Sequence, residues 1–287
     1  MPEDIKTMFT RAYPERDPWA HKGDFGYVMI LAGSQKYSGS PVFNAMGALR
    51  TGADLVVARG HLRAMDIAAR YASDIITVPF SWEFSEDDVL SVVNEMGNYH
   101  SLVIGCGMER SDNSFEAIRG LVKKTTIPMV LDAEAIRAIP GHTKQIDLSR
   151  AVLTPNSEEF RVLTGEEVGS NEDDRKEKVQ RWAHTLGTTI LLKGHIDVVS
   201  DGEHVFVNVT GVPYMTKGGF GDVLSGIVGS LLARGLTPFD AACLSVYING
   251  KAGEAASEKY GEGVLASDIF EYIPLVIGAA KEQLVRA

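Results

Sequence analysis

The sequence predicts a doubly wound α/β sandwich, in which a mostly parallel sheet lies between two layers of helices. Two observations lead to this fold class. Short apolar runs recur along most of the chain, and most are continuously apolar, as expected of strands covered on both faces. Segments with helical periodicity separate these runs, so strand and helix alternate. The sequence shows no internal repeat or Pro-rich linker, and we expect one domain over residues 1–287.

Each predicted element has its own signal. The apolar runs predict strands over residues 27–33, 54–58, 101–105, 127–133, 151–155 and 188–194. Between the first two runs, residues 40–52 have a helical pattern, with Ser40 as the expected N-cap and Pro41 in the first turn. Residues 196–208 carry an Asp-Gly pair between β-branched runs, which indicates a late antiparallel hairpin with a two-residue turn. Two further helices are predicted over 238–258 and 267–286.

Composition and charge restrict the possible partners. A net charge of −10 argues against nucleic acid or an anionic membrane as the main partner. The first residues lack the apolar core of a signal peptide, and no apolar run approaches the length of a membrane span, so we expect a cytoplasmic protein. The two cysteines, Cys106 and Cys243, lie far apart and show no metal or disulfide spacing, and we expect buried or partly buried free thiols.

The stretch KGGFGD, residues 217–222, is the clearest functional signal. Apolar residues after Asp222 recur in pairs every four positions, which predicts a helix that begins near Gly219. The N–H groups at a helix start bind phosphate, and glycine lets the backbone approach an anion closely. Asp222 would lie in the first turn, where it could take a proton from a hydroxyl that attacks a phosphoryl group. Spacing alone leaves a helix-capping role for Asp222 equally open.

Five segments in a fixed order resemble the ADP/ATP-dependent NAD(P)H-hydrate dehydratases of the ribokinase-like superfamily. These segments are residues 21–56, 130–136, 153–165, 191–202 and 215–254. The resemblance implies a ribokinase-like three-layer α/β/α sandwich and a hydro-lyase. Such an enzyme restores NADH or NADPH from the hydrates NADHX or NADPHX. It phosphorylates the 6-hydroxyl group with ADP or ATP as the phosphoryl donor and then eliminates phosphate.

The resemblance also implies roles for individual residues. Asp222 would be the catalytic base and would touch the substrate. The anion hole would consist of the N–H groups of Gly219, Phe220 and Gly221. The nucleotide would contact Gly221 together with Lys193, Gly194, His195, Ile196 and Asp197. The substrate would contact Ser40, Gly107 and Asn156.

Several positions depart from the family pattern. Asn156 stands where the family commonly has histidine, and Phe220 replaces a small residue. Cys106 and Glu109 replace the more usual proline and glycine. The run NSEE, residues 156–159, fits the Asn-x-x-Glu pattern of the wider superfamily, so we expect Glu159 to help place Mg²⁺ through water. The alternative for Glu159 is a carboxylate in the first turn of a helix.

The resemblance further implies the setting of the enzyme. The family's epimerase domain, which often precedes this one, has no room in the chain, so we expect a stand-alone dehydratase beside a separate NAD(P)HX epimerase. A homo-oligomer, often a tetramer, is also expected. Surface or structural roles are expected for the remaining histidines and the tryptophans, namely His61, His100, His142, His184, His204, Trp19, Trp82 and Trp182.

Two alternatives stay open at this point. One is a small-molecule kinase of the same superfamily, acting on a thiazole, a pyrimidine or a sugar. The other is a nucleotide-binding sensor that has lost catalysis; the departures at Asn156 and Phe220 motivate it, and Asp222 speaks against it. The sequence distinguishes neither ADP from ATP nor NADHX from NADPHX.

Overall fold

A nine-stranded sheet runs through the computed structural model, which describes the chain apart from residues 81, 82 and 287. Trp82 lies outside the described residues. The strands are β1 (Tyr27–Leu31), β2 (Leu55–His61), β3 (Ile75–Phe80), β4 (Ser101–Ile104), β5 (Met129–Leu131), β6 (Ala151–Leu153), β7 (Thr189–Leu192), β8 (Asp197–Ser200) and β9 (Val205–Asn208). Their order across the sheet is β3-β2-β1-β4-β5-β6-β7-β8-β9. β1 to β7 pair in parallel, whereas β8 and β9 are antiparallel to their neighbours.

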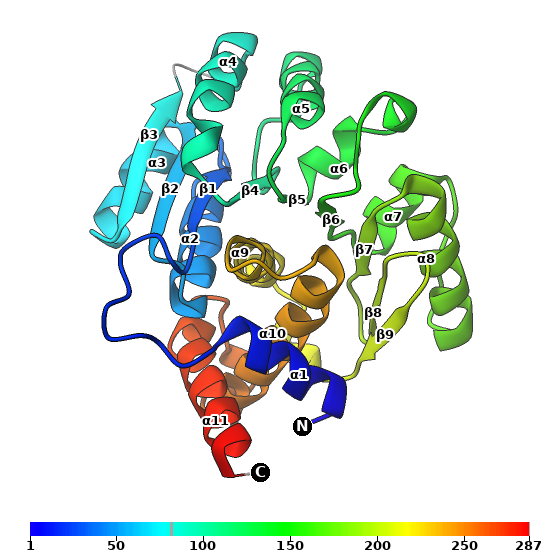
Figure 1. Cartoon of the computed structure of the whole chain (residues 1–287). Helices are drawn as coiled ribbons and strands as arrows, with labels where there is room; N and C mark the ends of the chain where they lie inside the picture. Colours follow the sequence, from blue (N-terminus) through cyan, green and yellow to red (C-terminus); the bar gives the residue numbers. More distant parts are fainter. Residues whose placement is uncertain (81–82, 287) are drawn as a thin grey trace.

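Helices cover both faces of this sheet (Figure 1). They are α1 (Glu3–Ala12), α2 (Ser40–Thr51), α3 (Leu62–Tyr71), α4 (Glu86–Glu95), α5 (Asp112–Lys124), α6 (Glu134–Ala138), α7 (Ser157–Thr164), α8 (Glu172–Leu186), α9 (Phe220–Ala233), α10 (Pro238–Tyr260) and α11 (Tyr272–Arg286). Within the described part of the chain, none of these helices combines the length and the apolar character needed to cross a membrane.

The apolar residues of β1 show how the three layers form. Val28 and Ile30 point into a core shared with α1, α2, α3, α9, α10 and α11. Met29 and Leu31 point the other way, into a core shared with α4, α5 and α6. Because successive side chains of a strand alternate between faces, a continuously apolar strand must be covered on both. The predicted α/β/α sandwich with a late antiparallel hairpin is therefore confirmed.

Three local predictions differ from the structure. β3 was not expected; it is a half-exposed edge strand with Pro79 inside it, so it lacks the continuous apolar run of the other strands. The hairpin loop has four residues instead of two, because Ser200 pairs with Val205. The N-cap of α2 is Gly39, and Ser40 is already the first helical residue.

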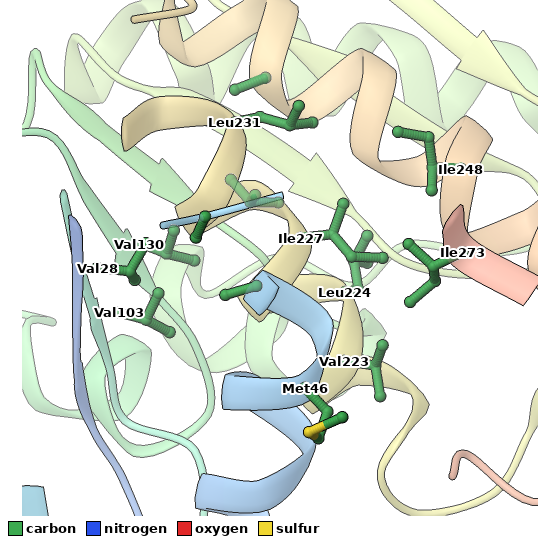
Figure 2. Packing of buried hydrophobic residues seen from close by; sticks show 14 of the residues in the cluster. Val28, Met46, Val103, Val130, Val223, Leu224, Ile227, Leu231, Ile248 and Ile273 are labelled. Atoms are coloured by element: carbon green, nitrogen blue, oxygen red, sulfur yellow. The ribbon is translucent and has the colours of Figure 1, made fainter. Parts of the chain in front are cut away.

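Helix α9 is held closely between α2 and the sheet. A Cβ on Gly226 would lie 2.0 Å from the backbone oxygen of Asn44, and one on Gly47 would lie 2.5 Å from that of Val223. The two helix backbones therefore touch, which only glycine allows at these positions. Figure 2 shows α9 side chains such as Ile227 packed among residues of the sheet, α2, α10 and α11. This packing fixes the start of α9, where several of the predicted site residues lie.

Candidate active site at the start of helix α9

The predicted site residues gather at one edge of the sheet. Asp132 directly follows β5, and Lys193 directly follows β7. Gly107 lies in the loop after β4, and Asn156 lies in the loop after β6. Carboxyl ends of parallel strands share one edge, and ligands of such sheets bind in the crevice there. The strand order changes direction between β1 and β4, which places this crevice in front of Gly107.

The start of α9 has the backbone geometry of an anion site. Gly219 is the N-cap with a φ of 99°, and a Cβ there would lie 2.9 Å from both Ala266 and the ring of Phe43. The first helical bond runs from the Val223 N–H to the Gly219 oxygen at 2.9 Å. Helix geometry leaves the preceding N–H groups free for a ligand. The Phe220 side chain is buried in the core, so its N–H takes part in this helix start like that of a small residue.

Asp222 lies in the first turn of α9 and is partly buried. The amide nitrogen of Asn44 donates to the Asp222 backbone oxygen at 2.7 Å and holds the turn. Burial and the nearby Asp132 carboxylate raise the pKa of Asp222 to about 6, although a hydrogen bond from Ser40, the charge of Lys193 and the neighbouring Cys106 thiol act in the opposite direction. An acid with this pKa is ionised at neutral pH and is still basic enough to take a proton.

Asp132 is a candidate site residue that sequence reasoning missed. It is 2 % exposed and accepts hydrogen bonds from Lys193 Nζ at 2.9 Å, Ser225 Oγ at 2.8 Å and Cys106 Sγ at 3.4 Å. Burial opposes its ionisation, but Lys193 and the other donors keep its pKa below the ordinary value. The sequence did contain a signal for Asp132: it is an acidic residue directly after an apolar strand, and the carboxyl ends of such strands border the ligand crevice.

Lys193 is the cation of the site. Its Nζ lies 2.9 Å from Asp132 Oδ1 and 3.9 Å from Glu159 Oε2. A Cβ on Gly221 would lie 3.3 Å from the same Nζ, so the ammonium group sits against the start of α9. Burial opposes this charge, yet Asp132 and Glu159 raise the pKa of Lys193 above its ordinary value. The side chain therefore remains charged beside the free N–H groups.

The rest of the predicted nucleotide segment forms the loop between β7 and β8. Gly194 and His195 are exposed, and Ile196 is partly exposed. Asp197 closes the loop by accepting the Gly194 N–H at 3.0 Å. Burial raises the pKa of Asp197. This loop continues directly from the charged Lys193 and is open to solvent.

Asn156 and Glu159 form a capping box at the start of α7. The Asn156 side chain accepts the Glu159 N–H, and the Glu159 carboxylate accepts the Asn156 N–H, both at 2.9 Å. Glu159 is buried, and this burial raises its pKa. The structural alternative for Glu159, a first-turn carboxylate, is thus present. The same carboxylate also faces Lys193.

Gly107 and Ser40 form the other wall of the site. Gly107 has a φ of 63°, and a Cβ there would lie 2.4 Å from Ser40 Oγ, so the position requires glycine. Ser40 also hydrogen-bonds to the carboxylate of Asp222. Beyond Gly107, a cavity of about 310 Å³ opens between Gly33, Phe84 and Glu109. Its lining includes Met108 and Glu109, the two residues that follow Gly107.

Three potential metal ligands meet in this site, but their chemistry does not suit a metal. The ligand atoms of Cys106, Asp132 and Asp222 lie within 4.8 Å of one another. Burial and the two carboxylates raise the pKa of the Cys106 thiol well above its ordinary value. A thiol must lose its proton to bind a metal, and the Lys193 ammonium already balances Asp132. We interpret the cluster as a hydrogen-bond network.

Comparison with known proteins identifies relatives over nearly the whole chain. A family model described as NAD(P)H-hydrate dehydratase matches residues 28–275. An ADP-dependent (S)-NAD(P)H-hydrate dehydratase of Cenarchaeum symbiosum is 36% identical over 270 residues, which is 92% of each chain. A bifunctional NAD(P)H-hydrate repair enzyme Nnr of Methanopyrus kandleri is 40% identical over 91% of this chain and 51% of its own length. The chain therefore spans about half the length of the bifunctional relatives that it matches.

Solved structures show the same fold. A ribokinase-like superfamily protein of Enterococcus faecalis superposes with a TM-score of 0.83 at 20% identity, covering 96% of this chain and 94% of its own. The ADP/ATP-dependent NAD(P)H-hydrate dehydratase of Bacillus subtilis, crystallised with ATP and Mg²⁺, superposes with a TM-score of 0.78 at 24% identity over 97% of each chain. The match of the family model to residues 28–275 covers most of the chain, and the strand order agrees with the fold of the solved relatives. The chain belongs to the NAD(P)H-hydrate dehydratase family.

Proposed function

We propose that the protein restores NADH and NADPH from their hydrates, NADHX and NADPHX, in a reaction that depends on ADP or ATP. One observation carries the proposal: the Asp222 carboxylate lies in the first turn of α9, and the Lys193 ammonium lies against Gly221 in the same turn. That arrangement suits phosphoryl transfer to a hydroxyl group. Family membership and the names of the relatives support the hydrate as the substrate.

The first step is phosphorylation of the hydroxyl group on the nicotinamide ring. Asp222 takes the hydroxyl proton while the hydroxyl oxygen attacks the terminal phosphoryl group of the nucleotide, whose bond to the rest of the nucleotide breaks and releases AMP from ADP or ADP from ATP. The N–H groups at Gly219, Phe220 and Gly221 and the Lys193 ammonium face the negative charge of the transferred group. Ser40, which hydrogen-bonds to Asp222 and touches Gly107, keeps the base aimed at the nicotinamide side of the crevice.

The second step is loss of phosphate. The lone pair of the ring nitrogen expels phosphate from the carbon that carried the hydroxyl group, which leaves an iminium ion. The neighbouring carbon then loses a proton to water or to the departing phosphate, and this restores the ring double bond. Phosphate is a far better leaving group than hydroxide, which explains why a kinase-like site achieves a net dehydration. The same N–H groups and Lys193 stabilise the departing phosphate.

The carboxylate of Glu159 is suited to contacting Mg²⁺ through a water molecule. One carboxylate oxygen is held by the Asn156 N–H and lies near Lys193, which suits contact through water better than direct ligation. Mg²⁺ bound to the nucleotide phosphates would neutralise part of their charge. The exposed loop of Gly194, His195 and Ile196 supplies the nucleotide wall, and Asn156 and Gly107 supply substrate contacts.

The proposal also covers the setting of the enzyme. The cavity beyond Gly107 provides space for the part of the dinucleotide that lies outside the nicotinamide ring. The net charge of −10 and the metabolite substrates support a cytoplasmic location without nucleic-acid or membrane partners. A homo-oligomer and a separate epimerase remain predictions from the family resemblance, and sedimentation analysis of the purified protein tests the first.

Replacement of Asp222 by Asn tests the assigned chemistry. NADHX, Mg²⁺ and ADP or ATP are mixed with the protein, and NADH is followed by its absorbance. We expect wild-type protein to restore NADH, and Asp222→Asn to lower the rate about 10²–10⁴-fold, the usual contribution of a general base. ADP affinity, measured by calorimetry, should stay nearly unchanged. Full activity in the variant would contradict the assignment.

A further inference from the structure

We propose that Asp132 is a positioning residue for this reaction: it keeps the Lys193 ammonium at the start of α9 and away from the base Asp222. The inference rests on the proposed function, because it concerns the two groups that act on the transferred phosphoryl group. Asp132 does not serve as a second base, since its two carboxylate oxygens already accept hydrogen bonds from three side chains.

The contacts of Asp132 join three separate parts of the site. Lys193 comes from the end of β7, Ser225 from the second turn of α9, and Cys106 from the loop after β4. The Ser225 hydroxyl also lies 3.0 Å from the Gly221 backbone oxygen and can share its one proton between that oxygen and Asp132, so it links Asp132 to the first turn of α9. The carboxylate therefore fixes the distance between the cation and the helix start.

The charges around Asp222 show what Asp132 prevents. Asp222 faces Asp132 from β5, Lys193 from β7, the Cys106 thiol from the loop after β4 and the Ser40 hydroxyl from α2. Lys193 is the only cation among these groups, and Glu159 on α7 is its other anionic neighbour. Without the Asp132 charge, the ammonium would pair with Asp222 or Glu159. An ion pair with Asp222 would hold the base in its ionised form and lower its basicity.

The backbone holds Asp132 in this place. Ala133, the next residue, has a φ of 46° and a ψ of −112°, a conformation that costs a non-glycine residue energy. A Cβ on Gly105 would lie 1.9 Å from the Asp132 backbone oxygen, so the loop after β4 packs directly against this turn. Backbone strain often occurs where a side chain must be held in one direction for function, and here that side chain is Asp132.

Replacement of Asp132 by Asn tests the proposal, because Asn keeps the shape of the side chain and removes its charge. Two readouts are needed: the acid limb of the pH profile of kcat/KM, and the titration of the Asp222 carboxyl carbon by NMR without substrate. We expect both to move to lower pH by roughly one unit or more, the usual effect of exchanging a like charge for an opposite one nearby. We also expect kcat at neutral pH to fall about 10- to 100-fold. Asp173→Asn, at a side chain that is 91% exposed, is the matched control and should change neither readout.

Three results separate the possibilities. A folded Asp132→Asn protein with an unshifted Asp222 titration would overturn the proposal and leave Asp132 a structural residue. A shifted titration in a protein that never restores NADH would sustain the proposal for Asp132 and reject the proposed function. If Asp132→Asn does not fold, Ser225→Ala replaces it, since it removes one hydrogen bond to Asp132 and no charge. A few-fold loss of kcat is expected there, and wild-type kinetics would overturn the proposal.

Discussion

Asp222 bears a charge that the fold disfavours and the proposed reaction needs. Its carboxylate is partly buried and lies beside a second carboxylate, Asp132, and both effects raise its pKa to about 6. The network of Ser40, Cys106 and Lys193 reduces this penalty without removing it. Function and stability therefore oppose each other at this residue.

The opposition predicts a pH-dependent gain of stability in Asp222→Asn. The folded-state pKa is above the unfolded one, so Asp222 costs nothing below about pH 4, where both states are protonated, and costs most above about pH 6. We expect the variant to be more stable than wild type by about 1–3 kcal/mol at pH 8. Urea unfolding at pH 4 and pH 8 measures this. An equal difference at both pH values would show that the cause is not the charge.

For single residues, the sequence predicts which side chains belong to the candidate site more readily than it predicts which residues they contact. KGGFGD indicated an anion site with an acid beside it, and the structure places Lys193, Gly107 and Ser40 around that acid. Asp132 was not predicted as a site residue, because its hydrogen-bond partners Lys193 and Ser225 are 61 and 93 positions away in the sequence. Only the fold brings them together, so no local spacing could indicate the role.

The contact between α2 and α9 is the element-scale feature on which the site depends. Asn44 on α2 holds the Asp222 backbone oxygen, and its own backbone oxygen lies where a Cβ of Gly226 would be. The same contact thus packs the core and holds the turn that carries the proposed base. A change there should affect stability and turnover together.

Gly226→Ala is expected to destabilise the protein by about 1–3 kcal/mol, because the added Cβ would lie 2.0 Å from a backbone oxygen and force the helices apart. We also expect kcat to fall, since Asn44 would move away from Asp222. Gly278→Ala is the control, because its added Cβ lies on the exposed side of α11 and, among the described residues outside the adjacent turns of its own helix, meets nothing within 4 Å. It should stabilise by about 0.5–1 kcal/mol. Thermal unfolding compares the two variants, and equal effects would contradict this account.

The elements themselves were largely predictable. Six strands are continuous apolar runs because helices cover both faces, and periodicity detects this directly. β3 was missed because an edge strand is covered less completely and tolerates Pro79. The length of the β8–β9 loop depends on Ser200, whose hydroxyl accepts the Gly202 N–H and donates to the His204 oxygen. The Asp-Gly pattern that indicates a turn does not predict these side-chain hydrogen bonds, so it did not give the loop length.

At the scale of the whole molecule, the strand order turns scattered residues into one site. The ends of β4, β5, β6 and β7 are consecutive at one edge of the sheet, and α9 starts against that edge. Alternating strands and helices predict a parallel sheet, but not the order of its strands. The family resemblance over residues 21–254 implied the three-layer sandwich, and the match to residues 28–275 agrees with that fold, but the strand order became known only from the structure.

The central claim is that this site couples phosphoryl transfer to loss of water from a nicotinamide hydrate. It is tested most directly by measuring NADH and phosphate together, with NADHX and Mg²⁺ in the presence and absence of ADP or ATP. The account predicts that NADH is restored only with nucleotide and that one phosphate is released for each NADH. Restoration of NADH without nucleotide would contradict the account, as would consumption of nucleotide with a phosphorylated vitamin or sugar precursor as the product.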